Sequence, residues 1–147
     1  MGCIFPQRSL RLNSEKVSEL YPFLAVRDVP RAVAFYAEAF GAVEEGERVI
    51  APDGPQVAVL TIAGHHVGVA TEAPELHTPS PETIGATTVR ISLHVDDPDR
   101  LQAQAVAAGA TELFPMADRP YGLRQGRVVD PFGHHWLIGR PLTRTEA

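Results

Sequence analysis

An internal repeat is the feature of this sequence that most constrains its fold. The segment Gly64–Ala70 (GHHVGVA) returns as Gly133–Gly139 (GHHWLIG), and 133 − 64 = 69. The segment Tyr21–Asp28 aligns with Arg90–Asp97 at the same offset, since 90 − 21 = 69. Two segments that repeat at one spacing indicate a single folding unit present twice. We therefore expect two copies of one module, whose equivalent positions can be compared within the chain.

Size and composition favour a single globular domain. The chain has 147 residues, of which 44% are hydrophobic and 21% are charged, which is ordinary for a globular protein with a sizeable core. The net charge is −5 and the basic residues are scattered, which argues against nucleic acid and anionic membranes as partners. The single cysteine, Cys3, favours the reducing cytoplasm, and no apolar run is long enough for a membrane span. Position 6 is Pro6, so an acylation signal is not expected, and no signal-peptide stretch follows.

Each copy of the repeat predicts the order strand, helix, strand, strand, strand. Asp28 and Asp97 are suited to cap a helix, and Gly41 and Gly109 to end one. Strands are predicted at 20–26, 56–62 and 65–70 in the first copy, and at 89–95, about 124–129 and 134–139 in the second. The chain then divides into an N-terminal extension, a first module, a proline-rich connector, a second module and a tail: residues 1–18, 19–72, 73–88, 89–141 and 142–147.

Alternation along the strands predicts which face each side chain occupies. Side chains two apart share a face, so Ile91, Leu93 and Val95 are expected to pack on the helix. The opposite face should carry a set of mostly polar and aromatic residues from both modules: Tyr21, Phe23, Ala25, His66, Gly68, Arg90, Ser92, His94, His135 and Leu137. Two such faces side by side would make a cup, and concave sites of this kind bind small molecules.

These motifs resemble the vicinal oxygen chelate superfamily of glyoxalases, bleomycin resistance proteins and extradiol dioxygenases. The resemblance rests on the repeated unit, on Phe35–Gly41 (FYAEAFG), on Tyr121–Arg124 (YGLR) and on Asp130–Trp136 (DPFGHHW), and it covers about residues 19–141. The stretch after Tyr121 is similar to the demethylubiquinone-methyltransferase-like branch. The resemblance implies an α+β fold in which two βαβββ repeats form a curved mixed sheet with a cup and helices on the outer face. We expect a homodimer, and the fold alone fixes no chemistry.

The resemblance also identifies where a metal would bind. In metal-using members the ligands come from the first and last strand of each module, and the matching positions here are Tyr21, Gly68, Arg90 and Leu137. Glycine and leucine offer no side-chain donor, a guanidinium repels a cation, and a neutral phenol is a poor ligand. The sequence therefore predicts a cup without the usual metal and without a cofactor.

Arg90 is the candidate on which function depends most. A buried arginine is costly unless a partner meets it, so we interpret Arg90 as an anchor for a carboxylate, phosphate or enolate oxygen; an internal ion pair is the alternative. Tyr21, Phe23 and Tyr121 are interpreted either as rings that stack on a flat ligand or as residues that only fill the cup. Arg124 is interpreted either as a residue at the mouth of the cup or as an exposed loop arginine. The predicted ligand-binding set is Tyr21, Phe23, His66, Gly68, Arg90, Ser92, His94, Tyr121, Arg124, His135 and Leu137.

Two classes of function remain open. The first is a binding protein that sequesters a small organic molecule, anionic or aromatic, as in drug or metabolite sequestration, with no catalytic residue. The second is an enzyme of the same superfamily, a lyase, isomerase or dioxygenase whose metal is held by His66, His94 and His135. A metal-free isomerase with His94 or His135 as general base belongs to this second class.

Overall fold

The computed structural model describes residues 18–143 and 145–146, so Cys3 and nearly all of the predicted N-terminal extension lie outside the described residues. The elements follow in the order β1 (Phe23–Val26), α1 (Val29–Phe40), β2 (Val43–Glu44), β3 (Val49–Ile50), β4 (Gln56–Ile62), β5 (His65–Thr71), η1 (Pro74–Leu76), α2 (Pro81–Ile84), β6 (Arg90–His94), α3 (Pro98–Ala108), β7 (Thr111–Asp118), β8 (Leu123–Val129) and β9 (His135–Pro141). The α+β class predicted from the sequence is confirmed.

Both long helices begin and end at the predicted residues. The Asp28 carboxylate accepts a hydrogen bond from the backbone N–H of Arg31 at 3.0 Å, and α1 ends at Gly41 with a φ of 66°. The Asp97 carboxylate accepts one from the N–H of Arg100 at 3.1 Å in α3. Such caps satisfy N–H groups that the first helical turn leaves without partners.

The strand order repeats the sequence repeat. Within the described residues the strands form two sheets, ordered β1-β5-β4-β2, with β3 also paired to β4, and β6-β9-β8-β7. In each module the first strand runs parallel to the last, and the other neighbours are antiparallel. The predicted pair of βαβββ modules is therefore confirmed, with one sheet from each module. β1 and β6 are the edge strands of these two sheets, and the modules join through their helices and core.

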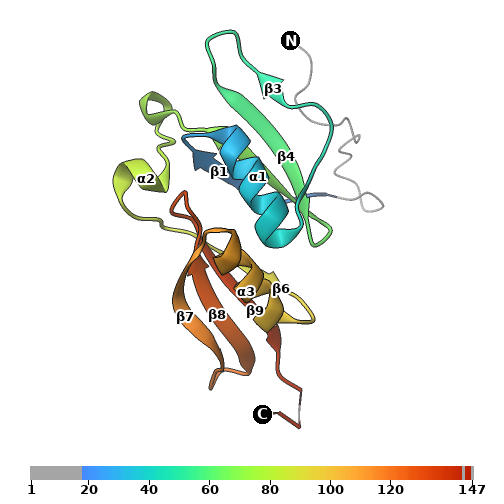
Figure 1. Ribbon diagram of the computed structural model, residues 1–147. Helices are drawn as coiled ribbons and strands as arrows, with labels where there is room; N and C mark the ends of the chain where they lie inside the picture. The colour runs from blue at the N-terminus through green and yellow to red at the C-terminus, as the bar shows by residue number, and fades with distance from the viewer. Residues whose placement is uncertain (1–17, 144, 147) are drawn as a thin grey trace.

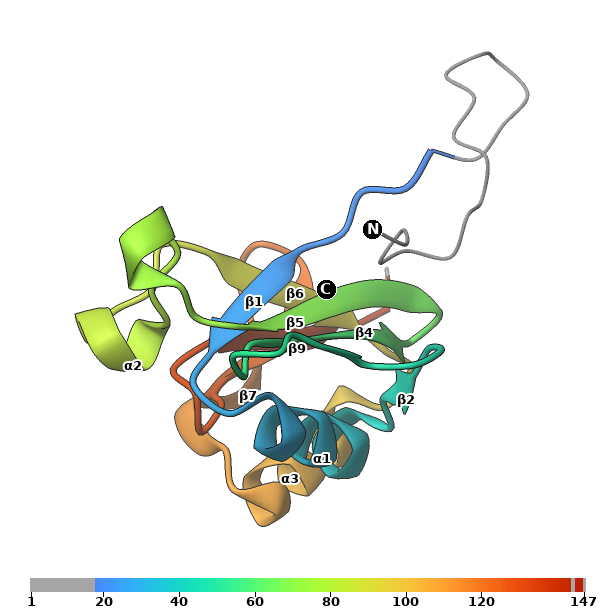
Figure 2. The ribbon, with the colours of Figure 1, turned by 90° about the horizontal axis from the view of Figure 1, so that it is seen from above.

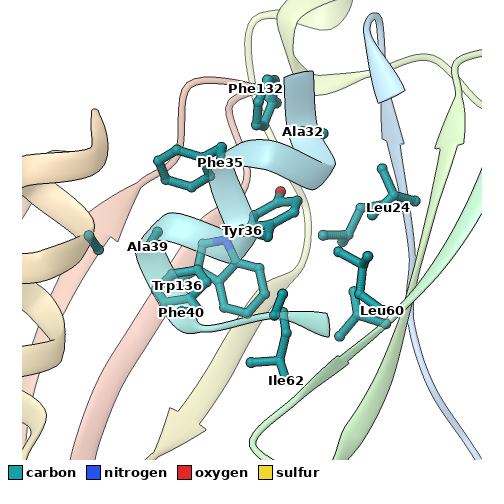
Figure 3. Packing of buried hydrophobic residues seen from close by; sticks show 14 of the residues in the cluster. Leu24, Ala32, Phe35, Tyr36, Ala39, Phe40, Leu60, Ile62, Phe132 and Trp136 are labelled. Atoms are coloured by element: carbon teal, nitrogen blue, oxygen red, sulfur yellow. The ribbon is translucent and has the colours of Figure 1, made fainter. Parts of the chain in front are cut away.

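The two long helices lie together on one side of both sheets (Figures 1 and 2). Between the modules is an aromatic core, in which Trp136 of β9 packs against Tyr36 and Phe40 of α1, with ring centroids 5.6 and 4.6 Å away (Figure 3). Phe132 adds an edge contact to Phe35 at 5.8 Å. The helix-free faces of the sheets are therefore left open on the opposite side of the molecule.

A buried carboxylate joins the modules beside this core. Asp130, which is 4% exposed, accepts hydrogen bonds from the Tyr36 hydroxyl and from Trp136 Nε1. It also accepts from the backbone N–H groups of Phe132 and His134, each at 2.9 Å. We call these five residues the Asp130 junction. Burial, followed by the charge of Asp130, raises the pKa of Tyr36 well above its ordinary value.

The connector folds onto the first module. The Glu72 carboxylate accepts a hydrogen bond from the backbone N–H of Ser80 at 2.6 Å and from the Thr83 hydroxyl at 2.7 Å. Arg27 Nε lies 3.5 Å from the same carboxylate. These contacts hold α2 against the end of β1. None of the helices in the described ranges is long and apolar enough to cross a membrane.

Candidate functional site

The facing predicted from alternation is confirmed. Leu93 is buried, whereas Ser92 and His94 are exposed on the helix-free face of β6. Arg90 is exposed on the same face, so the burial from which its need for a partner was argued is not found. On β9, Trp136 and Ile138 belong to the buried core. The residues between them therefore project to the open side of the second sheet.

One hollow on this open face is lined by residues of the second module alone. Its volume is about 590 Å³, which lies in the range of small-molecule sites. We call it the arginine hollow, and its lining residues are Arg90, Phe114, Arg119, Pro120, Tyr121, Gln125, Gly126, Arg127 and Leu137. Of the residues predicted from the sequence, Arg90, Tyr121 and Leu137 meet here.

Cationic side chains dominate the arginine hollow. Arg119 donates from Nε to the carbonyl of Gln125 at 3.0 Å and from Nη2 to the carbonyl of Pro115 at 2.6 Å. Arg127 lies over the Phe114 ring, with its Cζ 5.5 Å from the ring centroid, and its Nε is buried without a hydrogen-bond partner in the described part of the chain. Arg90 makes no hydrogen bond or ion pair with any residue that the structure describes.

No carboxylate offsets this charge. Within residues 18–143 the lining contains no Asp or Glu, and none of its arginines is ion-paired. The positive charge of the hollow also acts on the neighbouring His135. The pKa of His135 is lowered first by burial and then by the charge of Arg127. Tyr121 is held at the rim, where its hydroxyl donates to Gln125 Oε1 at 2.8 Å. The site is therefore a cationic hollow with aromatic walls.

The first module carries a separate, smaller hollow. It has a volume of about 300 Å³, and Tyr21 and His66 line it together with Glu19. His66 Nδ1 lies 3.3 Å from the Glu19 carboxylate, and the Tyr21 ring meets the His66 ring edge-on at 5.6 Å. Burial, followed by the charge of Glu19, raises the pKa of Tyr21.

Other predicted residues lie outside both hollows. The Phe23 ring covers Gly68, because a Cβ placed at Gly68 would lie 2.5 Å from that ring. Arg124 is ion-paired with Asp99 at 2.7 Å and with Asp118 at 2.8 Å. The remaining predicted residues, Ser92, His94 and His135, lie on the open face but do not line the arginine hollow.

The residues present do not fit a divalent metal. Gly68 and Leu137 supply no donor, and Arg90 brings a positive charge to the same face. Of the histidines of the alternative site, His66 lies on β5 of one sheet, whereas His94 and His135 lie on β6 and β9 of the other. Among residues 18–143 and 145–146, no group of three or more His, Cys, Asp or Glu side chains is placed to hold a metal ion.

Sequence reasoning missed Phe114, Arg119, Gln125 and Arg127. Arg127 lies directly opposite Leu137 in the β8–β9 register, so extending the alternation from β9 to β8 would have placed it on the open face. Phe114 lies on β7, which was not located, and Arg119 follows it. Nothing in their local pattern pointed to the hollow.

The comparisons with known proteins agree with this architecture. A family model described as Glyoxalase/Bleomycin resistance protein/Dioxygenase superfamily matches residues 19–138. The uncharacterized protein Rv0887c of Mycobacterium tuberculosis (strain ATCC 25618 / H37Rv) is 42% identical over 127 residues, which cover 84% of this chain and 74% of that protein.

Solved structures show the same fold. The crystal structure of TioX from Micromonospora sp. ML1 superposes with a TM-score of 0.65 at 31% identity, covering 86% of this chain and 100% of that one. The X-ray structure of the Arabidopsis thaliana gene product At5g48480 has a TM-score of 0.64 at 28% identity, covering 85% and 98%. The finer resemblance to a demethylubiquinone-methyltransferase-like branch stays a prediction.

Proposed function

The chain belongs to the Glyoxalase/Bleomycin resistance protein/Dioxygenase superfamily, and from this premise we propose that it binds a small organic anion in the arginine hollow without a metal ion. The observation that carries the proposal is Arg90, which lies in a hollow of about 590 Å³ and has no ion-pair partner among the described residues. A guanidinium presents five donors in a planar fork that matches a carboxylate or phosphate.

The walls of the hollow favour an organic body attached to the anion. Leu137 lines the hollow together with Phe114 and Tyr121, which are 49% and 63% exposed. Exposed aromatic rings lose water when a flat ligand stacks on them, which adds apolar stabilisation to the ionic contact. Arg90 would hold the anionic end of such a ligand while Leu137 and the rings cover the rest. The proposed role is ligand sequestration, with no catalytic residue.

Thermal shift and calorimetric titration with benzoate and phenyl phosphate test the proposal. Ligand binding to the folded state raises the midpoint of unfolding, and we expect Arg90→Met to weaken anion binding by roughly tenfold or more. Arg100→Met is the matched control, because Arg100 is an exposed arginine on α3 outside the hollow. Equal anion affinity in wild type and Arg90→Met would refute the anchor role.

We also infer that the chain forms a homodimer. Among the described residues β6 is the edge strand of its sheet, and a groove between the modules exposes Ile84 and Val89, which are 55% and 60% accessible. Exposed apolar side chains near a sheet edge favour contact with another chain, and a second copy brings the same surface. Light scattering should give the mass of a dimer, and Val89→Asp should shift it toward the monomer. A wild-type monomer at about 100 μM, well above typical dimer dissociation constants, would refute the inference.

A further inference from the structure

We propose that the ligand of the arginine hollow is a dianion: a flat, apolar body that carries negative charge at two ends. This inference rests on the proposed function and specifies the class of ligand. A single anionic group would meet Arg90 and leave the charges of Arg119 and Arg127 uncompensated in the same hollow. Like charges that share a small hollow repel one another, so a second anionic group adds attraction where repulsion would otherwise remain.

The arginines approach the hollow from different elements. Arg90 lies on β6 and Arg127 on β8, with β9 between them. The registers pair Arg90 with His135, and Arg127 with Leu137, so the two arginines are offset by two residues as well as by two strand spacings. Ordinary sheet dimensions then place their Cα atoms about 12 Å apart. Two guanidinium groups converging across this distance suit the opposite ends of a ligand about one ring wide.

Arg119 supports the Arg127 side of the hollow. Its Nε and Nη2 are already engaged by the carbonyls of Gln125 and Pro115, which fixes the guanidinium while its other N–H groups stay available. Arg127 is positioned instead by the Phe114 ring. Arg119 and Arg127 are both held by neutral groups, so neither guanidinium is neutralised by a carboxylate of the described residues. Leu137 lies between the two ends and contacts the apolar middle of the ligand.

Calorimetric titration of the full chain with isophthalate and benzoate tests the inference, because the probes differ by one carboxylate on the same ring. In wild type at low salt we expect isophthalate to bind roughly tenfold tighter than benzoate, with a steeper loss of affinity as salt is added. Arg127→Met should remove this preference and leave benzoate affinity within about threefold. Arg90→Met should weaken both ligands, and Arg100→Met neither.

The outcomes separate this inference from the proposed function. If benzoate and isophthalate bind wild type equally well, or if Arg127→Met keeps the preference, the dianion is refuted while anion binding stands. If neither carboxylate nor phenyl phosphate binds, the proposed function fails as well. Circular dichroism and thermal unfolding verify that each variant is folded. If Arg127→Met does not fold, Arg119→Met takes its place with the same expected loss of preference, and an unchanged preference there refutes the dianion.

Discussion

Replacing Tyr36 by phenylalanine removes a single hydroxyl from the Asp130 junction and changes little else. Tyr36 is fully buried, and its hydroxyl donates to the Asp130 carboxylate of the other module. After the change Asp130 still accepts from Trp136 Nε1 and from the backbone N–H groups of Phe132 and His134. The carboxylate therefore keeps several donors, and the variant measures one charge-assisted hydrogen bond across the module boundary.

A hydrogen bond to a charged group contributes about 1.5–3 kcal/mol to stability. We expect the free energy of unfolding of Tyr36→Phe to fall by about 2 kcal/mol, which corresponds to about 4–8 °C in Tm for a domain of this size. Asp130→Ala should cost more, about 4 kcal/mol, because the Tyr36 hydroxyl, the Trp136 indole and the backbone donors all lose their acceptor.

Urea denaturation followed by Trp136 fluorescence measures these differences, with calorimetry as a second probe. Tyr121→Phe is the matched control, because it also removes a tyrosine hydroxyl bonded to one side chain, but Tyr121 is 63% exposed. Its cost should be below about 0.5 kcal/mol. Stability of Tyr36→Phe equal to that of Tyr121→Phe would show that the junction does not stabilise the docking of the modules, and the reasoning would fail.

Three further predictions concern Glu72, Gly139 and His135. Hydrogen bonding from the backbone N–H and hydroxyl of Ser80 lowers the pKa of Glu72 from 4.5 to about 2. The ionised Glu72 therefore stabilises the fold above pH 4.5, and this stabilisation is lost as the pH falls from 4.5 toward 2. The free energy of unfolding of Glu72→Gln, measured by denaturation at several pH values, should lack this part of the pH dependence. A Cβ at Gly139 would lie 2.4 Å from the carbonyl oxygen of Arg124, so Gly139→Ala should lose about 2–3 kcal/mol in urea denaturation, and a loss below about 0.5 kcal/mol would contradict this. Because the charge of Arg127 contributes to the lowered pKa of His135, Arg127→Met should raise that pKa in an NMR titration, and an unchanged pKa would show that the charge of Arg127 does not act on His135.

The parts of the fold that sequence could predict are those fixed by local chemistry. Asp28 and Gly41 delimit α1 because a carboxylate cap and a left-handed glycine act within a few residues of the helix ends. The internal repeat predicted the order of the elements, because the two modules fold in the same way and bury the same face of their sheets. Strand β7 was not predicted from the sequence, because Pro115 interrupts its alternating pattern and its register with β8 shifts on both sides of Phe114. Such irregular pairing is tolerated at a sheet edge, and it leaves no periodic signal.

Most of the correctly predicted lining of the candidate site came from strand alternation, and Tyr121 came from the motif that follows β7. Arg90 and Leu137 followed from alternation on strands that were placed correctly, and both line the arginine hollow. Alternation also placed His66 and His94 on the open faces of their strands. These strands belong to different sheets, because the modules dock through α1 and the core. How two modules dock is decided by long-range packing such as that of Trp136 on Tyr36. A pattern read within one module carries no information on that packing.

The two modules differ in which strand carries the bulky residue at equivalent positions of their open faces. At the offset of 69 residues, Phe23 and Gly68 correspond to Ser92 and Leu137. Each pair lies side by side on parallel strands. In the first module the large side chain is on the edge strand, and its ring covers the space above Gly68. In the second module the edge strand carries only a serine, so no neighbouring ring is there to cover Leu137, and the face stays open for the arginines around it. The bulky residue therefore lies on the edge strand in the first copy of the duplicated face and on the inner strand in the second, and the arginine hollow lies over the second copy.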